Sequence, residues 1–312
     1  MSGRVFVAYT GGTIGMMPTD RGYAPVPGAF PERMRRILAE FPEELPGFEI
    51  EEFDPLLDSA NMRPADWNCI AERIAERYDD FDVFVVLYGT DTLAYTASAL
   101  SFMLEGLRKP VLVTGSQIPF SRVRSDARRN LVDALLLAAE FSIPEVGVVF
   151  DDALYRGNRS TKVSASDLDA FRAPNYPPLA RTGTQIRVEH DHVRKAPRGP
   201  LKIQRVREAR VGALRLFPGI DAQVVENVLA PPLEGLVLEA YGVGNAPVRD
   251  EELIRVLSEA SERGVIIAVC SQCLAGSVDL ESYATGRALQ DAVAIGVRDM
   301  TAEAAMAKML NL

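Results

Sequence analysis

Two short segments place hydroxyl side chains among glycines. Residues 10–15 read TGGTIG, and residues 88–92 read YGTDT. Glycine permits a tight turn and close ligand approach, and backbone N–H groups in such a turn can hold an oxyanion. Neither segment matches G-x-x-x-x-G-K-[ST] or G-x-G-x-x-G, so neither predicts a phosphate site. Each loop alone also fits an ordinary turn with a capping threonine, so the two are informative mainly together.

A hydroxyl nucleophile needs a group that takes its proton. The two histidines, His190 and His192, lie in a charged, proline-containing stretch that is typical of a solvated linker. Ser-His-Asp and Cys-His chemistry are therefore not expected. Where histidine is absent, a lysine whose pKa is lowered by burial can serve, oriented by a carboxylate. Thr90, Asp91 and Lys162 are the right residue types, although sequence alone does not bring them together.

Three cysteines, Cys69, Cys270 and Cys273, are too few for a disulfide framework. Cys270 and Cys273 form a C-x-x-C, which fits a redox pair or half of a zinc site. No further ligands lie nearby in the sequence, so we expect a reduced, buried pair at the end of a strand, with no metal and no cofactor.

The elements that must position these loops alternate between short apolar runs and longer amphipathic ones. Expected strands are Val5–Tyr9, Val83–Leu87, Val111–Thr114 and Val146–Phe150; expected helices are Pro64–Tyr78, Thr92–Leu107 and Ser125–Phe141. This order predicts an α/β fold with a mostly parallel sheet flanked by helices. Ligands of such sheets bind beyond the carboxyl ends of the strands, where both glycine loops fall.

A length of 312 residues is near the limit of a single core, so two domains are expected. We expect an N-terminal catalytic domain over residues 1–189, a connection over 190–208 where periodicity fades, and a smaller C-terminal α/β domain over 209–312. Its expected strands are Val211–Phe217, Gly235–Leu238 and Val265–Val269; its helices are Asp221–Leu229, Glu251–Arg263 and Met300–Leu310.

The overall charge argues against several partners. A net charge of −9 repels nucleic acid and anionic membranes. No apolar run approaches the roughly 20 residues that span a bilayer, and the first residues resemble a strand more than a signal peptide. We therefore expect a cytoplasmic protein. Four arginines lie beside Asp126 in the run Arg122–Arg129, which predicts a solvated helix start with local ion pairs.

Longer strings identify a family. TGGTIG, YGTDTLAYTASALSFML, TGSQIP, RGNRSTK and YGVGNAP closely resemble the type I (cytoplasmic) bacterial L-asparaginases, and the likeness runs over essentially the whole chain. GGTI and GTDT are signatures of asparaginases and glutaminases. The resemblance implies a larger N-terminal and a smaller C-terminal α/β domain. It also implies a homotetramer of intimate dimers, with each active site near a neighbour's C-terminal domain.

The resemblance also implies catalytic roles. Thr13 matches the nucleophile that forms a β-aspartyl ester, and Tyr23 matches a lid tyrosine that hydrogen-bonds the hydroxyl of that threonine. Thr90, Asp91 and Lys162 match the second catalytic set, in which Thr90 acts on the attacking water or holds the transition state. Asp91 also matches the carboxylate that binds the α-amino group of asparagine.

Further matches concern substrate binding. Asp58 and Ser59 fall where the family holds the α-carboxylate and amino group, and Ser116 falls beside the amide end. Asn245 either reaches a neighbour's active site or shapes a turn, and both alternatives stay open. The segment from residue 15 to residue 28 contains glycines and prolines that suit a closing lid. Asp279 and Glu281 are the two candidates for a carboxylate lent by a neighbouring subunit.

A regulatory site is also suggested. Some type I enzymes have an effector site for asparagine, and Ser271, Gln272 and Cys273 closely match part of it. Glu239 stands where those enzymes have an arginine. This charge reversal removes the partner of an effector carboxylate and argues against allosteric activation.

The activity expected from the resemblance is that of an L-asparagine amidohydrolase with L-asparagine as its substrate. Three alternatives use the same family resemblance: a mixed glutaminase-asparaginase, an amide-transfer subunit acting on a charged tRNA, and a non-catalytic amino-acid sensor. The short acidic chain lacks an appended RNA-binding region, which argues against amide transfer. A sensor would need Asp91 but no nucleophile.

Overall fold

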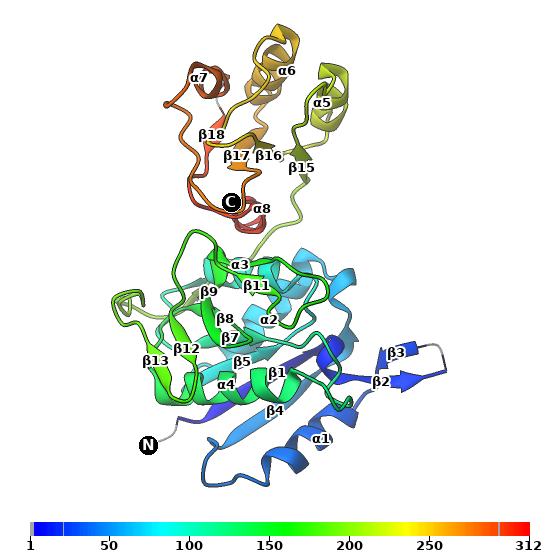
Figure 1. Ribbon diagram of the computed structural model, residues 1–312, viewed down its shortest axis with the longest axis vertical. Helices are drawn as coiled ribbons and strands as arrows, with labels where there is room; N and C mark the ends of the chain where they lie inside the picture. Colours follow the sequence, from blue (N-terminus) through cyan, green and yellow to red (C-terminus); the bar gives the residue numbers. More distant parts are fainter. Residues whose placement is uncertain (1–2, 21, 293) are drawn as a thin grey trace. The chain divides into compact units, whose positions relative to one another are not determined.

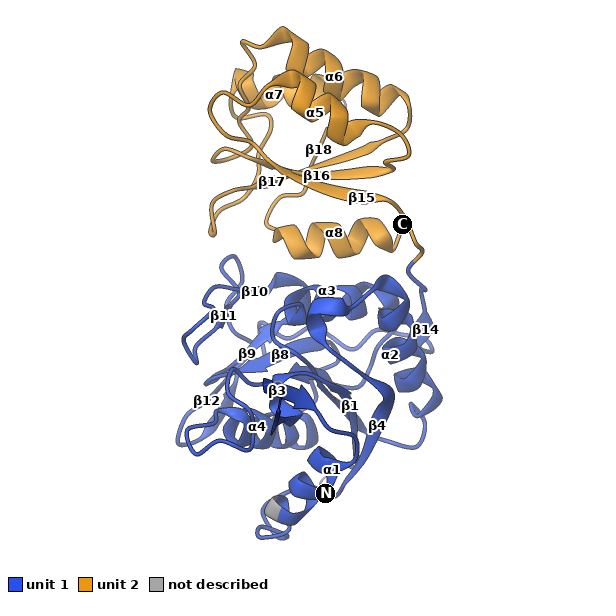
Figure 2. Ribbon diagram, turned by 90° about the vertical axis from the view of Figure 1, so that its right-hand side faces the viewer, with its two compact units in different colours: residues 1–206 blue, residues 207–312 orange. Residues whose placement is uncertain are grey.

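The structure is a computed structural model that describes residues 3–20, 22–292 and 294–312. It forms two compact units, which meet in the chain between Val206 and Arg207 (Figure 2). Most of the stretch 190–208 lies within the first unit, because β14 (Lys202–Ile203) pairs with β6 (Leu104–Glu105). Each unit has its own hydrophobic core and is described separately.

An eight-stranded sheet forms the centre of the first unit as described. Its strand order is β13-β12-β9-β8-β7-β5-β1-β4. The five parallel strands are β1 (Val5–Gly11), β4 (Phe48–Leu57), β5 (Val83–Leu87), β7 (Val111–Thr114) and β8 (Val146–Phe150). The antiparallel extension consists of β9 (Ala153–Arg156), β12 (Ala180–Thr182) and β13 (Ile186–Val188). The expected mostly parallel sheet is confirmed.

Helices cover both faces of this sheet. Figure 1 shows α2 (Pro64–Glu76) and α3 (Leu93–Met103) over one face, and α1 (Ala29–Leu38) and α4 (Ala127–Glu140) over the other. Because both faces are covered, every residue of β1 and β5 is buried, which explains the apolar runs Val5–Tyr9 and Val83–Leu87. Helix α2 begins with Pro64 in its first turn, and the Asp66 carboxylate accepts the backbone N–H of Arg63 at 2.7 Å.

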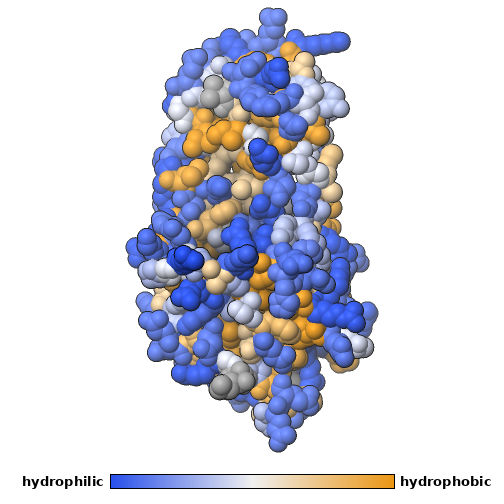
Figure 3. Space-filling view, turned by 90° about the vertical axis from the view of Figure 1, so that its left-hand side faces the viewer, coloured by the Kyte–Doolittle hydropathy of each residue, from blue (hydrophilic) through white to orange (hydrophobic). Residues whose placement is uncertain are grey.

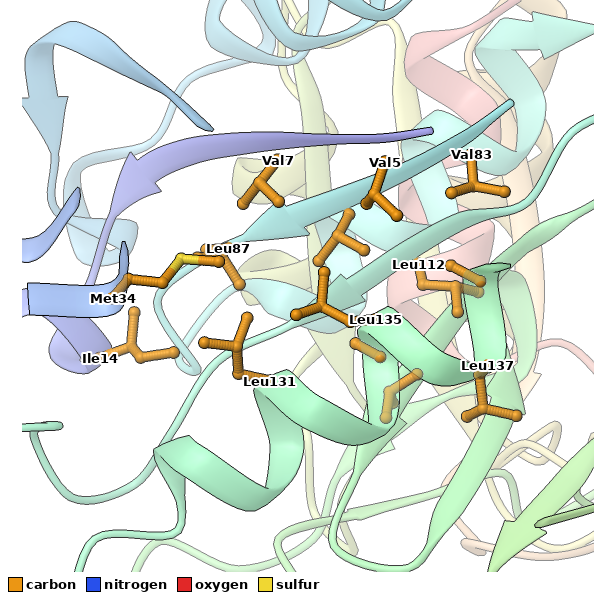
Figure 4. Packing of buried hydrophobic residues seen from close by; sticks show 14 of the residues in the cluster. Val5, Val7, Ile14, Met34, Val83, Leu87, Leu112, Leu131, Leu135 and Leu137 are labelled. Atoms are coloured by element: carbon orange, nitrogen blue, oxygen red, sulfur yellow. The ribbon is translucent and has the colours of Figure 1, made fainter. Parts of the chain in front are cut away.

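The core beneath α4 fixes the helix against the sheet. In Figure 4, side chains of the strands lie opposite those of α4, and Ile14 and Met34 extend the cluster: Val5, Val7, Val83, Leu87 and Leu112 face Leu131, Leu135 and Leu137. Truncation of one such buried leucine to alanine typically costs about 2–5 kcal/mol. This packing determines where the first residue before α4, Asp126, is held.

A hairpin of β2 (Met16–Thr19) and β3 (Gly22–Pro25) projects from the first unit (Figure 1). Both of its ends rest on the region around Tyr9. A Cβ at Gly15 would collide with the buried Tyr9 hydroxyl. At the other end, Phe30 lies 4.6 Å from the Tyr9 ring, and Glu52, paired with Tyr9 across the sheet, accepts the backbone N–H of Gly28 at 2.9 Å.

The second unit is a smaller α/β domain, as expected. Its described sheet has four parallel strands: β15 (Val211–Arg215), β16 (Gly235–Ala240), β17 (Ile266–Ser271) and β18 (Ile295–Gly296). Figure 2 shows α5 (Ala222–Leu229), α6 (Glu251–Glu262) and α7 (Ala284–Asp291) on one face and α8 (Ala302–Leu310) on the other. In neither unit does the described chain contain a helix long and apolar enough to cross a membrane.

Candidate active site

The loops that follow the parallel strands of the first unit meet at one edge of the sheet. Gly12, after β1, lies against the backbone of Gly89, after β5, and a Cβ on Gly12 would collide with it. Gly12 also has φ 83°, which favours glycine. A Cβ on Gly89 would collide with Ser59, after β4, and one on Gly115, after β7, with the Tyr88 carbonyl. Glycine therefore lets four loops come into contact.

Lys162 joins two members of the expected second catalytic set. It lies on β10 (Thr161–Lys162), which pairs with β11 (Phe171–Arg172). Its Nζ donates to Thr90 Oγ1 at 2.9 Å and forms an ion pair with Asp91 Oδ1 at 2.8 Å. Thr90 is only 5% exposed, whereas the Asp91 side chain is 65% exposed. The structure thus brings Lys162 to two adjacent residues that lie 72 and 71 positions before it in the sequence.

Two buried phenols precede the glycine loops in the chain, Tyr9 in β1 and Tyr88 after β5. Burial raises the pKa of Tyr88 to about 12, with smaller opposing contributions from hydrogen bonds such as that to Thr92 at 3.0 Å. Burial also raises the pKa of Tyr9, and the nearby charge of Glu52 adds to this effect. Both phenols therefore stay uncharged at neutral pH. Asp91 and Lys162 supply the charge beside Thr90.

Thr13 and Tyr23 are not joined in this structure. Thr13 is half-buried and begins the 3-10 turn Thr13–Gly15, and its hydroxyl makes no hydrogen bond to any described residue. The Tyr23 hydroxyl instead accepts a hydrogen bond from Arg122 at 3.0 Å, and Tyr23 is 43% exposed. Sequence reasoning missed Arg122, which had the appearance of a solvated residue before a helix. The Tyr23 hydroxyl is the acceptor of this bond, so its own proton can still be donated to another group.

Asp126 holds the loop after β7. Its buried carboxylate accepts the backbone N–H groups of Gln117 and Ile118, each at 3.0 Å. The Asn130 side chain donates to the Gly115 carbonyl at 3.0 Å and to Asp126 at 3.1 Å. The expected local ion pairs at this helix start are present, because Arg129 pairs with Asp151 at 3.4 Å, whereas Asp126 itself binds strand-end N–H groups.

Ser116 does not present its hydroxyl to the loop cluster. It is completely buried, and its Oγ donates to the Ile118 carbonyl at 2.8 Å. The neighbouring Gln117 is half-buried and reaches the catalytic set instead, because its Oε1 accepts from Thr90 Oγ1 at 3.0 Å. Sequence reasoning missed Gln117. Its position in a Gly-containing loop after a third parallel strand was the available signal.

Asp58 and Ser59 lie at the end of β4, beside the same edge. The exposed Asp58 carboxylate accepts the backbone N–H of Ala60 at 3.2 Å and so begins the short turn Ser59–Asn61. Ser59 is buried, and its carbonyl accepts from Thr92 Oγ1 at 2.8 Å. Ser59 therefore ties the loop after β4 to the loop that carries Thr90 and Asp91.

The remaining candidates lie in the second unit and form local bonds. Asn245 Oδ1 accepts from Thr285 at 2.7 Å, and the backbone of Asn245 bridges to Tyr241. Ser271 Oγ donates to the Gly242 carbonyl at 2.6 Å and accepts the N–H of Cys273 at 3.0 Å. These contacts shape two adjacent loops.

Gln272 and Glu239 complete this region. The Gln272 amide donates to the carbonyls of Leu216 at 2.5 Å and Glu239 at 2.8 Å. The Glu239 carboxylate forms an ion pair with Arg215 at 3.3 Å. An effector carboxylate would need a cation at position 239. This position instead holds Glu239, whose carboxylate already pairs with Arg215.

The C-x-x-C motif is not a buried pair. Cys270 is buried in β17, and burial raises its pKa to about 12, whereas Cys273 is exposed, and both thiols are free. The expectation of two buried cysteines is therefore wrong for Cys273, which follows the strand end. Among the residues described, no group of three or more His, Cys, Asp or Glu side chains could hold a metal ion.

Comparison with known proteins places the whole chain. The family model "Asparaginase, N-terminal" matches residues 4–194, and "Glutaminase/Asparaginase C-terminal domain" matches residues 210–312. L-asparaginase 1 of Escherichia coli (strain K12) is 48% identical, over 98% of this chain and 90% of that protein. The Homo sapiens protein named 60 kDa lysophospholipase is 42% identical, over 98% of this chain and 57% of its own length.

A solved structure agrees with these sequence matches. L-asparaginase I from Vibrio cholerae superimposes with a TM-score of 0.92 at 46% sequence identity, covering 100% of this chain and 92% of the other. The two family models together match nearly every residue on both sides of the division between the units. The chain therefore belongs to the asparaginase family.

Proposed function

We propose that this protein hydrolyses L-asparagine to L-aspartate and ammonia with Thr13 as its nucleophile. The observation that carries the proposal is the joint contact of Lys162 with Thr90 and Asp91, next to the loop that presents Thr13. Family membership and the names of the similar bacterial proteins support the same reaction.

The reaction requires two steps. In the first, Thr13 Oγ attacks the side-chain amide carbon of asparagine, an ester bond forms, and the C–N bond breaks. The hydroxyl proton leaves with the amino group as ammonia. In the second, water attacks the β-aspartyl ester, and its proton returns to Thr13 as aspartate departs. Backbone N–H groups of the glycine loops are suited to hold the oxyanion of both steps.

The remaining roles follow from charge and position. Asparagine is zwitterionic, so its pocket needs a carboxylate for the ammonium group and donors for the carboxylate. The exposed Asp91 and Asp58 carboxylates lie on loops of the same edge and suit the α-amino end, with Ser59 between the loops. In this role Tyr23 would hydrogen-bond Thr13 when the hairpin closes, and closure would exclude water.

Other readings remain as alternatives to be measured. A mixed glutaminase-asparaginase would use the same residues on a side chain one methylene longer, and hydrophobic pockets discriminate such a difference by only about 1–3 kcal/mol. A non-catalytic sensor would bind asparagine without turnover.

A homo-oligomer in the cytoplasm is the assembly and location that we infer. Several large apolar side chains of the second unit are more than half exposed, namely Phe217, Leu274, Tyr283 and Ile295. Figure 3 shows hydrophobic areas among hydrophilic ones on one face of the molecule. Such areas are typical of protein contacts. Asn245 and a carboxylate at Asp279 or Glu281 are the candidates for a neighbour's contribution.

Regulation by asparagine at Ser271, Gln272 and Cys273 is not part of this proposal. Their polar groups form bonds within the second unit, and Glu239, the acid at the position of the effector's cation, forms an ion pair with Arg215. We expect hyperbolic dependence of rate on asparagine concentration. A sigmoidal dependence that Glu239→Arg steepens further would contradict this expectation.

Ammonia release tests the proposal. Purified full-length protein is incubated with asparagine or glutamine, and initial rates are measured over a wide concentration range. We expect turnover of asparagine well above that of glutamine, and loss of turnover in Thr13→Ala at unchanged thermal stability. Stoichiometric asparagine binding without ammonia would support the sensor instead, and near wild-type activity in Thr13→Ala would end the nucleophile assignment.

A further inference from the structure

Gln117 occupies a position in the site that the reaction scheme above does not use. Its side chain contacts Thr90 on one side and the Asp167 carbonyl on the other, where its Nε2 donates at 3.2 Å. A carbonyl can only accept, so the amide nitrogen must face Asp167 and the amide oxygen must face Thr90. The orientation of the amide is thereby fixed by chemistry.

Two independent supports hold the amide in this place. The Gln117 backbone N–H is bound by the buried Asp126 carboxylate at 3.0 Å. The Asp167 carbonyl lies in a turn in which Ser164 Oγ accepts the Asp167 N–H at 2.9 Å. That turn follows directly after Lys162, so the segment that delivers the lysine also supplies the carbonyl that orients the glutamine.

The contacts of Thr90 then assign its one proton. Gln117 Oε1 carries no hydrogen, so the Thr90 hydroxyl must donate to it at 3.0 Å. Lys162 Nζ donates to the Thr90 hydroxyl oxygen at 2.9 Å and occupies one of its lone pairs. A hydroxyl oxygen has two lone pairs, so one remains. In this state Thr90 has only an accepting site left to offer to a further group.

We propose that Gln117 is a positioning residue that commits the Thr90 proton and leaves Thr90 as an acceptor for the attacking water. The inference rests on the proposed function, and within it concerns the second step. The free lone pair accepts one O–H of the water and aims the water oxygen at the ester carbon. Without Gln117 the hydroxyl can turn its proton toward the water, which then loses that orientation.

A kinetic signature separates this role from a general weakening of the site. If only ester hydrolysis slows, kcat and KM fall by the same factor, because both depend on that step, while kcat/KM reports the first step and stays constant. We expect Gln117→Met, which keeps length but removes the acceptor, to lower kcat by about tenfold or more. A burst of about one ammonia per active site should precede the slow phase.

The matched variants are Gln117→Glu and Gln223→Met. Gln117→Glu keeps an acceptor oxygen toward Thr90 and should recover a kcat between those of Gln117→Met and the wild type. Gln223→Met removes an exposed amide of α5, which bonds to Glu226 and Asn227 of the same helix, and should leave both constants unchanged. Thermal unfolding of each variant checks folding, which the backbone bond to Asp126 should preserve.

Defined outcomes overturn the inference. An unchanged kcat in Gln117→Met, a fall in kcat/KM equal to the fall in kcat, or equal losses in the Met and Glu variants would each contradict it. In all three cases the wild-type protein still releases ammonia and Thr13→Ala still does not. If the proposed function itself fails, wild-type protein releases no ammonia from asparagine, so the two failures are distinguishable.

Discussion

Polar side chains follow the parallel strands in both units, yet they are used differently. In the first unit, Thr90 exchanges hydrogen bonds with Lys162 and Gln117, two side chains from distant segments, and Thr13 keeps its hydroxyl free of described partners. In the second unit, Ser271 and Gln272 donate to backbone carbonyls. Polar side chains are found at strand ends in both units. A reactive site also needs ionisable side chains whose hydrogen bonds are not all made to the backbone of the turn.

Among the substitutions considered, removal of Lys162 should lower catalytic activity the most, because Lys162 contacts both Thr90 and Asp91. Lys162→Met deletes the cation that contacts both Thr90 and Asp91 while keeping most of the side-chain volume. We expect kcat for asparagine to fall by about a thousandfold, within the range of positioned acid–base groups. Steady-state ammonia release measures it. Lys202→Met, an exposed lysine on β14, is the control, and a similar loss there would point to a general effect of charge.

The contact between the two glycine loops should matter next. Gly12→Ala adds a Cβ that collides with Gly89 and also strains a φ of 83°. Gly219 has nearly the same φ, 86°, with open space around it. We expect Gly219→Ala to cost about 1 kcal/mol of strain alone and Gly12→Ala about 3 kcal/mol or more. Denaturant unfolding measures both, and equal costs would show that the loops can separate freely.

The support of the β7 loop provides a third comparison. Asn130 is 1% exposed and bonds to the Gly115 carbonyl, to Asp126 and to the backbone N–H of Asp151. Asn130→Ala removes all of these bonds, although Asp126 keeps the N–H groups of Gln117 and Ile118, so we expect a loss of about 2–3 kcal/mol in the free energy of unfolding. Asparaginase activity should fall as well. Intact activity at reduced stability would separate loop support from catalysis.

Asn245 is the counterpart in the second unit. Its side chain forms a partly buried bond to Thr285, in the first turn of α7, so Asn245→Ala should cost about 1 kcal/mol. Its kinetic effect decides between the two alternatives for this residue. A raised KM with unchanged kcat would indicate that Asn245 reaches substrate in an oligomer, and unchanged constants would indicate a turn residue.

The smallest change in stability is expected from Asp133, a carboxyl group in α4 that lies outside the strand-end loops. Burial raises its pKa, although the Thr182 hydroxyl, bonded at 2.7 Å, opposes this shift. A raised folded-state pKa means that stability is greatest below the unfolded pKa and declines as pH rises through the folded pKa. Asp133→Asn should therefore be more stable than wild type at pH 7. This gain should shrink in unfolding measurements made toward pH 4.

The sequence predicted those parts whose signal is local. The strands Val83–Leu87 and Val146–Phe150 agree with the structure because burial on both faces leaves continuous apolar runs. Strands β12 and β13 were missed, since three-residue segments carry too little periodicity and are defined by pairing with distant neighbours. Helix α1, which follows the β2–β3 hairpin, was also missed, because the sequence before it is rich in glycine and proline.

The site followed the same rule. Glycine loops after strands were visible in the sequence, whereas the contact of Lys162 with Thr90 depended on the resemblance, because it spans 72 positions. Gln117 and Arg122 were missed because an amide or an arginine beside a turn has no distinctive local pattern. Their partners, Thr90 and Tyr23, come from other segments.

The seat of the β2–β3 hairpin has a consequence for protein engineering. Both ends of the hairpin contact Tyr9 or its neighbour in the sheet. Gly15 lies against the Tyr9 hydroxyl, Phe30 packs on the Tyr9 ring, and the Gly28 N–H bonds to Glu52 beside Tyr9. A hairpin transplanted from a relative to alter substrate range would arrive without these contacts unless Tyr9 and Glu52 came with it. The segment to be exchanged is therefore not continuous in the sequence: it comprises the hairpin together with Tyr9 on β1 and Glu52 on β4.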